Sequence, residues 1–281
     1  MIRGSFWERL VRGTGWTWLD ERHRDALPAD LPETVMALES RDRFHAKQGR
    51  STARVVFHSA SGPLPVYLKR HYRLPWRSRL AALIDRGDGR HTPAAAEWAH
   101  LERARALGIA VPEVVAVGER IGPWGALQSF LMVTELTGCL PLHEALPALA
   151  GTLDRPAFAA LKRALIAEMA SITATLHGHC LFHKDLYLCH FYLDVETPSP
   201  DARRLSLIDL HRLAEHRRWP DRWRWKDLGQ LWFSTHGVAG VEPRDAPRFW
   251  KHYRKRLGLR RHRWHLRMIG LKAARYLAHN Q

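Results

Sequence analysis

Five ionisable side chains lie in otherwise apolar stretches of the sequence, and their types and order fit phosphoryl transfer. Lys69 ends the run PVYLK, and Glu97 lies in the alanine-rich run AAAEWAH. Asp185 and His190 share the segment LFHKDLYLCHFYLD, and Asp209 follows the apolar run in LSLIDLHR. Transfer of the γ-phosphate of ATP uses a lysine against the phosphates, a glutamate that holds it, an aspartate that accepts the hydroxyl proton, and an aspartate that holds Mg²⁺. The sequence supplies these four side chains in that order.

Each of these residues also has a plainer structural explanation. An isolated His-x-Asp can begin a helix or a turn, an aspartate after an apolar run can simply end a strand, and strands often end in lysine for solubility. The combination favours catalysis, because Asp209 lies 24 residues beyond Asp185 and both follow Lys69. We therefore predict that Asp185 is the catalytic base and that Asp209 is a metal ligand. Lys69 would contact the nucleotide phosphates, with Glu97 as its partner.

A second glutamate, Glu102, lies on the same predicted helix as Glu97 and is the other candidate partner for Lys69. The two glutamates are five positions apart, so their side chains point about 140° apart around a helix, and only one can face the lysine. Glu97 lies among Ala and Trp, whereas Glu102 is beside Arg103 and Arg105. The apolar neighbours favour Glu97 as the buried partner.

His190 and Asp227 are two further candidates. In the protein-kinase pattern H-R-D-x-x-x-x-N the last position is a metal-binding asparagine, whereas this sequence has His190 there and a lysine in place of the arginine. Imidazole is a poor ligand for Mg²⁺, which prefers hard oxygen donors. A metal role and a role in ordering the loop by hydrogen bonding therefore both stay open for His190, as does the number of magnesium ions. Asp227 is expected to cap a helix and to brace the catalytic loop by accepting backbone N–H bonds, as the matching aspartate does in kinase-like folds.

Hydrophobic periodicity and turn residues predict the elements that must position these side chains. Residues 50–71 predict a hairpin around SASGPLP, and strands are expected in IAVPEVVAVGER and GALQSFLMVTEL. Helices are expected over 94–108 and 154–180. A short strand is expected over 204–213 with helices after it, whereas residues 1–40 predict an irregular start. Strands around one helix, followed mainly by helices, are typical of an α+β fold.

The chain is strongly basic. It has 281 residues, with 44 Lys and Arg against 28 Asp and Glu, and a formal net charge of +16. From Arg203 to the end there are 20 Lys and Arg against 6 Asp and Glu, a net charge of +14. Such a field favours an anionic partner, which could be nucleic acid, an anionic membrane surface or a phosphorylated or carboxylated substrate. The segment RRWPDRWRWK adds rings suited to stacking on bases or to a membrane–water interface.

Cysteine usage and hydropathy indicate the compartment. Cys139, Cys180 and Cys189 match neither a zinc motif nor a disulfide framework, which indicates a reducing environment. The start MIRGSFWERLVRG lacks the apolar core of a secretory signal, and no run of 18 apolar residues predicts a membrane-spanning helix. We expect a protein of the cytoplasm or of the inner face of a membrane.

Several of these segments together resemble a known family. HKDLYLCHFYLD and LSLIDLHR resemble the lipopolysaccharide core heptose kinase family, the Kdo/heptose kinase group of Gram-negative bacteria. VYLKRH, AAEWAHLERARALGIAVP and RRWPDRWRWKDLGQLWFS resemble the same family in the same order, over about residues 45–240. The pair CHF and IDLHR is more specific than His-x-Asp alone. The family is similar in fold to eukaryotic-type protein kinases, and it phosphorylates an inner-core sugar on the cytoplasmic side of the inner membrane with ATP and Mg²⁺.

The resemblance implies a protein-kinase-like, two-lobed α+β fold. A small β-rich lobe is expected over residues 1–138 and a larger helical lobe over 139–281. Glu135 and Leu136, at the expected connection between the lobes, are assigned to nucleotide binding beside the lysine–glutamate pair. ATP and Mg²⁺ are the expected cofactors, and His190 is assigned to the metal together with the aspartate of IDLHR.

The resemblance also implies the acceptor, an anionic, lipid-anchored inner-core sugar, most directly a heptose. Peripheral contact with the inner membrane is then expected, and nucleic acid is not. Two other functions stay open. A small-molecule kinase of the aminoglycoside or choline type would suit an acidic acceptor cleft, which the basic C-terminal region disfavours. A catalytically degenerate kinase-like module that binds nucleic acid or membrane is disfavoured by intact Lys69, Asp185 and Asp209.

Overall fold

The computed structural model divides the chain into two compact units. It describes residues 5–39, 43–47, 49–59, 62–72, 76–84, 92–196, 205–260 and 262–279. The first unit comprises Met1–Arg103 and Pro112–Glu135, and the second comprises Ala104–Val111 and Leu136–Gln281. The break after residue 135 precedes the expected lobe boundary, and residues 104–111, expected in the first lobe, belong to the second unit. Both sheets and helices are present, as the α+β class requires.

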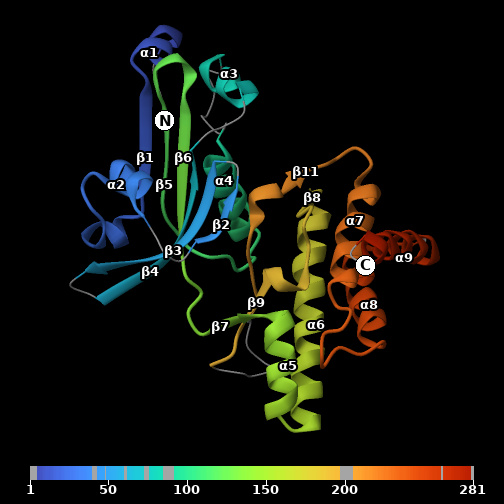
Figure 1. Ribbon diagram of the computed structural model, residues 1–281. Helices are drawn as coiled ribbons and strands as arrows, with labels where there is room; N and C mark the ends of the chain where they lie inside the picture. Colours follow the sequence, from blue (N-terminus) through green and yellow to red (C-terminus); the bar gives the residue numbers. More distant parts are fainter. Residues whose placement is uncertain are drawn as a thin grey trace. The chain divides into compact units, whose positions relative to one another are not determined.

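A six-stranded antiparallel sheet organises the first unit, in the order β1-β5-β6-β4-β3-β2 (Figure 1). The strands are β1 (Thr14–Leu19), β2 (Arg43–Lys47), β3 (Arg50–Ser59), β4 (Gly62–His71), β5 (Val114–Ile121) and β6 (Leu127–Thr134). The helices are α1 (Phe6–Val11), α2 (Leu31–Ala37), α3 (Trp76–Ile84) and α4 (Pro93–Ala106), with short 3₁₀ segments η1 (Glu21–Ala26) and η2 (Pro123–Gly125). The last residues of α4 belong to the second unit.

The predicted hairpin is confirmed, and its pleat explains which side chains reach the site. β3 and β4 pair in continuous register from Arg50↔His71 to Ser59↔Gly62. Successive side chains of a strand point to opposite faces, so Val66 and Leu68 face one side of the sheet and Lys69 the other. Val66 and Leu68 pack with Leu31 and Val35 of α2 in a buried core cluster. Lys69 therefore lies on the opposite face of the sheet, where its side chain contacts Glu97 of α4.

Residues 5–39 form regular elements, so the expectation of an irregular start over residues 1–40 is wrong for the part that the structure describes. β1 pairs antiparallel with β5 from Thr14↔Ile121 to Leu19↔Ala116. Trp16 and Trp18 place their rings 5.8 and 5.1 Å from that of Trp98 on α4. A partner about 80 residues away stabilises this strand, and no local pattern could have indicated it.

The second unit combines short strands with long helices. Its strands form a sheet in the order β10-β9-β7 and a separate pair, β8 with β11. They are β7 (Cys139–Pro141), β8 (Leu181–Phe182), β9 (Phe191–Asp194), β10 (Leu205–Leu207) and β11 (Ala214–Glu215). The helices are α5 (Leu142–Thr152), α6 (Arg155–Gly178), α7 (Pro220–Phe233), α8 (Asp245–Leu257) and α9 (His262–His279), with 3₁₀ segments η3 (Leu188–His190) and η4 (Leu210–Arg212).

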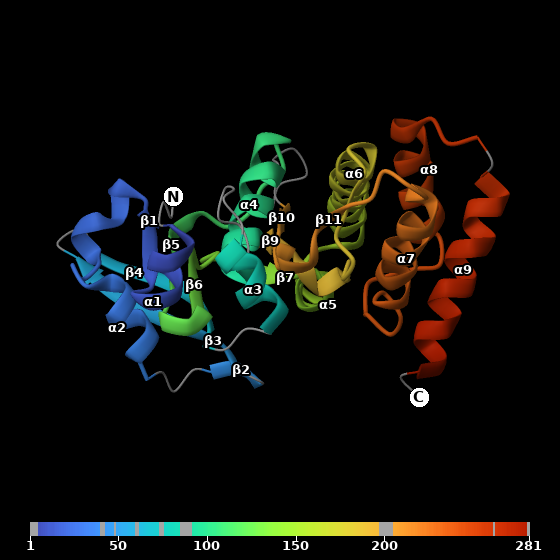
Figure 2. The ribbon, with the colours of Figure 1, turned by 90° about the horizontal axis from the view of Figure 1, so that it is seen from above.

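Four helices share the core of the second unit (Figure 2). Ala170 and Ala174 of α6 pack with Leu228 of α7, Tyr253 of α8 and Ile269 of α9. The side chain of Asp154 caps α6 by accepting the Ala157 N–H at 2.7 Å, which fixes where this helix begins. No helix within the described ranges is long and apolar enough to cross a membrane.

Candidate active site

In the first unit, Lys69 and Glu97 form the predicted pair. Lys69 Nζ donates a hydrogen bond to Glu97 Oε1 at 2.6 Å, and the Glu97 side chain is almost fully buried, with 4% exposed. Glu102 lies on the exposed face of α4, so the choice between the two glutamates is confirmed. Because a buried carboxylate is costly without a cation, Glu97 holds the Lys69 ammonium at the sheet surface.

In the second unit, Asp227 braces the loop that contains Asp185, as predicted, but it lies inside α7 and does not cap that helix. Its carboxylate is fully buried and accepts the backbone N–H groups of His183 and Lys184 at 2.8 and 2.9 Å. His177 Nε2 lies 3.3 Å from the same carboxylate, and its Nδ1 lies 2.7 Å from the Tyr253 hydroxyl. Burial lowers the pKa of His177, which keeps its ring neutral. The chain Tyr253–His177–Asp227 therefore fixes the loop from the helical core.

The residue before the predicted base has a left-handed backbone. Lys184 has φ 68°, a conformation that costs roughly 1 kcal/mol or more for a side chain with a Cβ. The two N–H groups held by Asp227 keep the backbone in this conformation. Lys226 Nζ adds a hydrogen bond to the Lys184 carbonyl. The turn presents the next side chain, that of Asp185.

Asp185 is contacted by a guanidinium and an amide. Arg212 Nη1 lies 3.0 Å from Oδ1 and 2.7 Å from Oδ2, and Gln230 Nε2 lies 3.4 Å from Oδ1. Gln230 also donates to the Tyr187 hydroxyl at 3.0 Å, which orients its amide. The Asp185 side chain keeps 19% of its surface exposed. A carboxylate that is oriented yet accessible suits a group that takes a proton from a bound hydroxyl.

His190 lies between Asp185 and Asp209. Its Nδ1 is 2.7 Å from the Asp185 carbonyl oxygen, and because a carbonyl only accepts, Nδ1 carries the proton. The other nitrogen, Nε2, lies 3.9 Å from Asp209 Oδ2, and His211 Nδ1 lies 2.7 Å from Asp209 Oδ1. His190 stacks on His183 with ring centroids 5.4 Å apart. The structure thus brings both predicted metal ligands together, and it also gives His190 the loop-ordering hydrogen bond.

The two residues predicted at the lobe connection lie on either side of the break between the units. Both carboxylate oxygens of Glu135 accept from Arg54 at 2.8 Å, and this ion pair lowers the pKa of Glu135. The Glu135 N–H donates to the Pro65 carbonyl at 3.0 Å, and the Leu136 carbonyl accepts from Cys139. A contact of Glu135 with a nucleotide would therefore use its backbone carbonyl.

Some sequence expectations fall partly outside the described residues. The sequence offers only one glycine, in Gln48-Gly49-Arg50-Ser51, for a phosphate loop; Gln48 lies outside the described residues, and Gly49 has φ 79°. The Arg-rich insert YRLPWRSRLAALIDRGDGR after β4 could contact an anionic acceptor by its composition, but its Arg73, Arg86 and Arg90 also lie outside. The segment RRWPDRWRWK suits the same acceptor by its composition, but its Arg224 is buried and pairs with Asp221.

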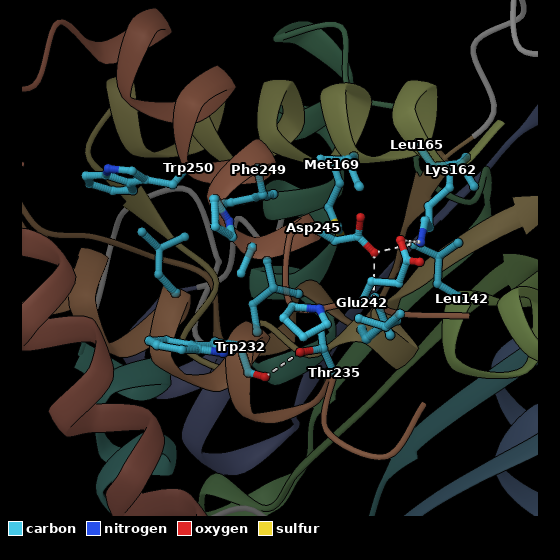
Figure 3. Close-up of a pocket in the computed structure, with 18 of the residues that line it drawn as sticks. Leu142, Lys162, Leu165, Met169, Trp232, Thr235, Glu242, Asp245, Phe249 and Trp250 are labelled. Carbon is cyan, nitrogen blue, oxygen red and sulfur yellow. Dashed lines mark hydrogen bonds and ion pairs between the residues drawn. The ribbon is translucent and has the colours of Figure 1, made fainter. Parts of the chain in front are cut away.

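The second unit contains an apolar cavity of about 720 Å³ (Figure 3). Its walls come from α6, α7 and α8, with Leu165, Met169 and Trp250 among the lining residues. At one side Lys162 Nζ pairs with Glu242 and Asp245, each at 2.9 Å. The lining is mainly aliphatic and aromatic, so the cavity suits an apolar ligand.

A second, smaller cavity of about 420 Å³ adjoins the loop that contains Asp185 and is basic. The residues that line it are Lys184, Arg212, Arg222, Trp223, Lys226, Lys272 and Tyr276. Sequence reasoning missed Arg212 and Gln230 as contacts of Asp185, the predicted base, and Lys226 as a contact of the preceding residue, Lys184. The only available signals were that Arg212 follows IDL and that Gln230 lies one helical turn after Asp227.

Comparisons with known proteins agree with this geometry. The sequence profile of the "Lipopolysaccharide kinase (Kdo/WaaP) family" matches residues 40–253. The chain belongs to this family.

Relatives with a stated function are similar over part of their length. "Lipopolysaccharide core heptose(I) kinase WaaP" of Pseudomonas aeruginosa is 37% identical over 161 residues, which cover 57% of this chain and 59% of that protein. Proteins of the same description from Escherichia coli and its strain K12 are 34% and 33% identical, over 56% and 64% of this chain and 58% and 68% of theirs. The matched region thus spans less than two thirds of the first two relatives.

A solved structure titled "WaaP in complex with acyl carrier protein" is also similar. It superimposes with a TM-score of 0.69 at 30% sequence identity, covering 92% of this chain and 98% of that chain. The protein-kinase-like α+β fold expected from the sequence is therefore confirmed.

Proposed function

We propose that this chain transfers the γ-phosphate of ATP to a hydroxyl of a lipopolysaccharide inner-core sugar, most directly a heptose. The observation that carries the proposal is the joint placement of Asp185 and Asp209 around His190 in a chain of the Kdo/WaaP family. Asp185 would accept the proton of the sugar hydroxyl as the oxygen attacks phosphorus. Lys69, held by Glu97, would neutralise the nucleotide phosphates.

The residues present fit a magnesium ion. Within the described ranges no group of three or more His, Cys, Asp or Glu side chains could hold a metal by itself. Magnesium needs no such cage, because one or two carboxylates together with substrate phosphates and water complete its octahedron. Asp209, whose side chain is 32% exposed, would hold the ion, with His190 as its neighbour. The ion would neutralise charge on the transferred phosphate.

Phosphorylation of a defined acceptor tests the reaction. Purified protein, ATP and Mg²⁺ are incubated with deacylated inner-core oligosaccharide that lacks heptose phosphate, and the product is analysed by mass spectrometry. We expect the mass of one added phosphate, located on a heptose by fragmentation. An unchanged oligosaccharide with active controls would contradict the proposal, and phosphate on another sugar would correct the acceptor.

We further propose that this chain binds acyl carrier protein, the partner in the similar structure's title, and that the apolar cavity accepts its acyl group. The support is the cavity of about 720 Å³ (Figure 3). Acylated carrier should bind more tightly than unacylated carrier, as measured by calorimetry. Ala246→Phe, which fills the cavity, should remove that preference, whereas Ala148→Phe outside the lining should keep it. Equal binding of both carrier forms to the parent would contradict this use of the cavity.

We also propose that the first unit contacts the anionic cytoplasmic surface of the inner membrane. α1, α3 and η2 pack together at one end of the sheet (Figure 1). They expose Trp7, Trp76 and Trp124 at 69%, 65% and 78% of their surfaces. Arg77 lies over the Trp76 ring, 5.7 Å from its centroid. Interfacial tryptophans beside arginines suit the headgroup region of an anionic bilayer.

Vesicle binding tests this surface. Cosedimentation with vesicles of phosphatidylethanolamine and phosphatidylglycerol should fall at least about tenfold when Trp7, Trp76 and Trp124 are all changed to Ser. Trp219→Ser provides the control, because Trp219 lies in the second unit and is 83% exposed. Equal binding of the triple variant and the control would contradict the proposal.

A further inference from the structure

The basic cavity beside the loop that contains Asp185 combines five cationic side chains from four parts of the second unit. Lys184 comes from the loop, Arg212 from η4, Arg222 and Lys226 from α7, and Lys272 from α9. Among the described residues, those that line this cavity include no carboxylate. Like charges gathered at one cavity repel each other, so such a cluster is stabilised by an anionic ligand.

Aromatic and backbone contacts hold these cations in place. Lys184 Nζ and Arg222 Cζ lie 5.3 and 5.6 Å from the Trp223 ring centroid, within cation–π range. The Trp223 ring is in turn stacked on the His216 ring, with ring centroids 4.0 Å apart. Burial, aided by the charges of Arg212 and Lys184, lowers the pKa of Lys226, because a partly buried ammonium is less well solvated. The cluster is therefore a built part of the unit rather than a set of freely solvated side chains.

Arg212 links the cavity to the chemistry. It lines the cavity and also contacts both oxygens of Asp185 through Nη1. The nearby carboxylates are already engaged, since Asp185 holds Arg212 and Asp227 holds the loop backbone. An anion in the cavity would lie next to the group that accepts the acceptor proton. A substrate can place an anion there only if its charged group is close to its reacting hydroxyl.

We propose that this cavity binds a carboxylate or phosphate carried by the acceptor, close to the sugar hydroxyl that is phosphorylated. The assignment rests on the proposed function and adds the substrate feature that the enzyme reads. An acidic sugar or a sugar phosphate adjoining the acceptor sugar would be held by the ammonium groups of Lys226 and Lys272 and the guanidinium of Arg222. The anion would orient the acceptor hydroxyl toward Asp185.

Kinetics of two peripheral variants test the assignment. Arg222→Gln and Lys272→Gln remove cavity charges without touching the residues placed in the catalytic machinery. Each should raise the KM for core oligosaccharide about tenfold, the loss expected for one charge-assisted hydrogen bond. The KM for ATP and the melting temperature should stay at the parent values. Arg218→Gln and Lys255→Gln make the same change in net charge at exposed positions outside the cavity, and should change nothing.

Modified acceptors identify the anion. One portion of the oligosaccharide has its carboxylates reduced to alcohols, and another is treated with phosphatase. Removal of the recognised group should raise the KM of the parent protein to the value of the variants. It should have little further effect on Arg222→Gln or Lys272→Gln, because removing the anion and removing the cation abolish the same contact. Whichever treatment does so names the carboxylate or the phosphate.

Three results would overturn the assignment. A rise in the KM for ATP instead of the acceptor would place the nucleotide in the cavity. If the Arg222 and Lys272 variants have the same acceptor KM as the Arg218 and Lys255 controls, the cluster is a solvated surface that does not bind the acceptor. Acceptor modification that harms parent and variants equally would place the recognised anion elsewhere.

Failure of the proposed function would be seen separately, as a parent that phosphorylates no core acceptor. The acceptor assignment then falls with it. Melting curves with inorganic phosphate, against chloride at equal ionic strength, distinguish this outcome from loss of the anion site itself. Stabilisation of the parent but not of Lys272→Gln would still establish anion binding in the cavity, and no difference would remove that too.

Discussion

Asp185 is the residue on which the proposed reaction depends most directly. Asp185→Asn keeps an oxygen that can accept from Arg212 and Gln230 but removes the basic carboxylate. We expect kcat to fall 10²–10⁴-fold, the usual range for loss of a general base, with ATP affinity retained. The control is Asp154→Asn, since Asn caps the start of α6 as well as Asp does. Retention of more than about a tenth of kcat would reject Asp185 as the base.

Asp209 and Asp227 should fail in different ways. Asp209→Asn tolerates the left-handed backbone at φ 59° but weakens metal binding, so Mg²⁺-dependent ATP binding should be lost at nearly unchanged stability. Asp227→Ala leaves two buried N–H groups and His177 without their acceptor, so unfolding free energy should fall by about 2–5 kcal/mol. Calorimetry of nucleotide binding and chemical denaturation separate the two. Equal destabilisation with unchanged metal affinity in both variants would refute the division of roles.

The Lys69–Glu97 pair links nucleotide binding to the stability of the first unit. Lys69→Met should lower stability by about 1–3 kcal/mol, because it leaves the Glu97 carboxylate buried without its cation. Adding Glu97→Gln should restore much of the melting temperature but not the affinity for ATP. Recovery of both in the double variant would show that Lys69 serves only to neutralise Glu97.

At the scale of elements, helix α7 carries Asp227 and Gln230, and its position depends on close packing against α9. Gly229 permits this approach, since a Cβ there would lie 2.6 Å from Cβ of Lys272. Gly229→Ala should lower the free energy of unfolding by about 1–3 kcal/mol, despite the better helix propensity of alanine. Gly151→Ala in α5 is the matched control, because a Cβ there meets nothing within 4 Å, and it should stabilise by up to about 1 kcal/mol.

The opposite stability changes expected for these two substitutions test whether α7 and α9 are in close contact at Gly229. Denaturant midpoints should move in opposite directions for Gly229→Ala and Gly151→Ala. If both substitutions stabilise the protein, α7 and α9 are not in close contact at Gly229. The position of Gln230 relative to Asp185 would then lose its structural basis.

At the scale of the whole molecule, stability should depend on pH through the buried histidine under the catalytic loop. Burial lowers the pKa of His177 below its ordinary value of about 6.5, so below about pH 6.5 the unfolded chain binds a proton that the folded chain does not. The contribution is fully present above that pH and is lost as pH falls, with a slope of at most about 1.4 kcal/mol per pH unit. Denaturation at several pH values should show it, and His177→Gln should reduce the slope. An equal slope in the variant would assign the dependence to other groups.

Net charge is the other property of the whole molecule that bears on function. The formal charge of +16 attracts anionic partners over long distances, but it does not select among them. Selection requires local geometry, which we propose the cations that line the basic cavity provide. Screening by salt should therefore weaken encounter with any anionic surface more than it weakens discrimination between acceptors.

The sequence by itself determined the candidate site residues that local patterns and short motifs mark. The end of the run PVYLK indicated Lys69, apolar neighbours favoured Glu97 over Glu102, and the motifs HKD and IDLHR marked the two aspartates. The segment before residue 40 escaped prediction, because β1 is stabilised by β5 and by Trp98, far along the chain.

Only the tertiary structure decided which side chains surround Asp185. Arg212 and Gln230 reach Asp185 from 27 and 45 positions away, and Lys272 of α9 lines the same cavity as Arg212. Nothing local distinguishes these residues from the many other polar and basic side chains, because their surroundings depend on how η4, α7 and α9 pack around one loop. The sequence gives the sign of each charge, but the electrostatic field at a single carboxylate depends on distances that only the packing of the folded chain sets.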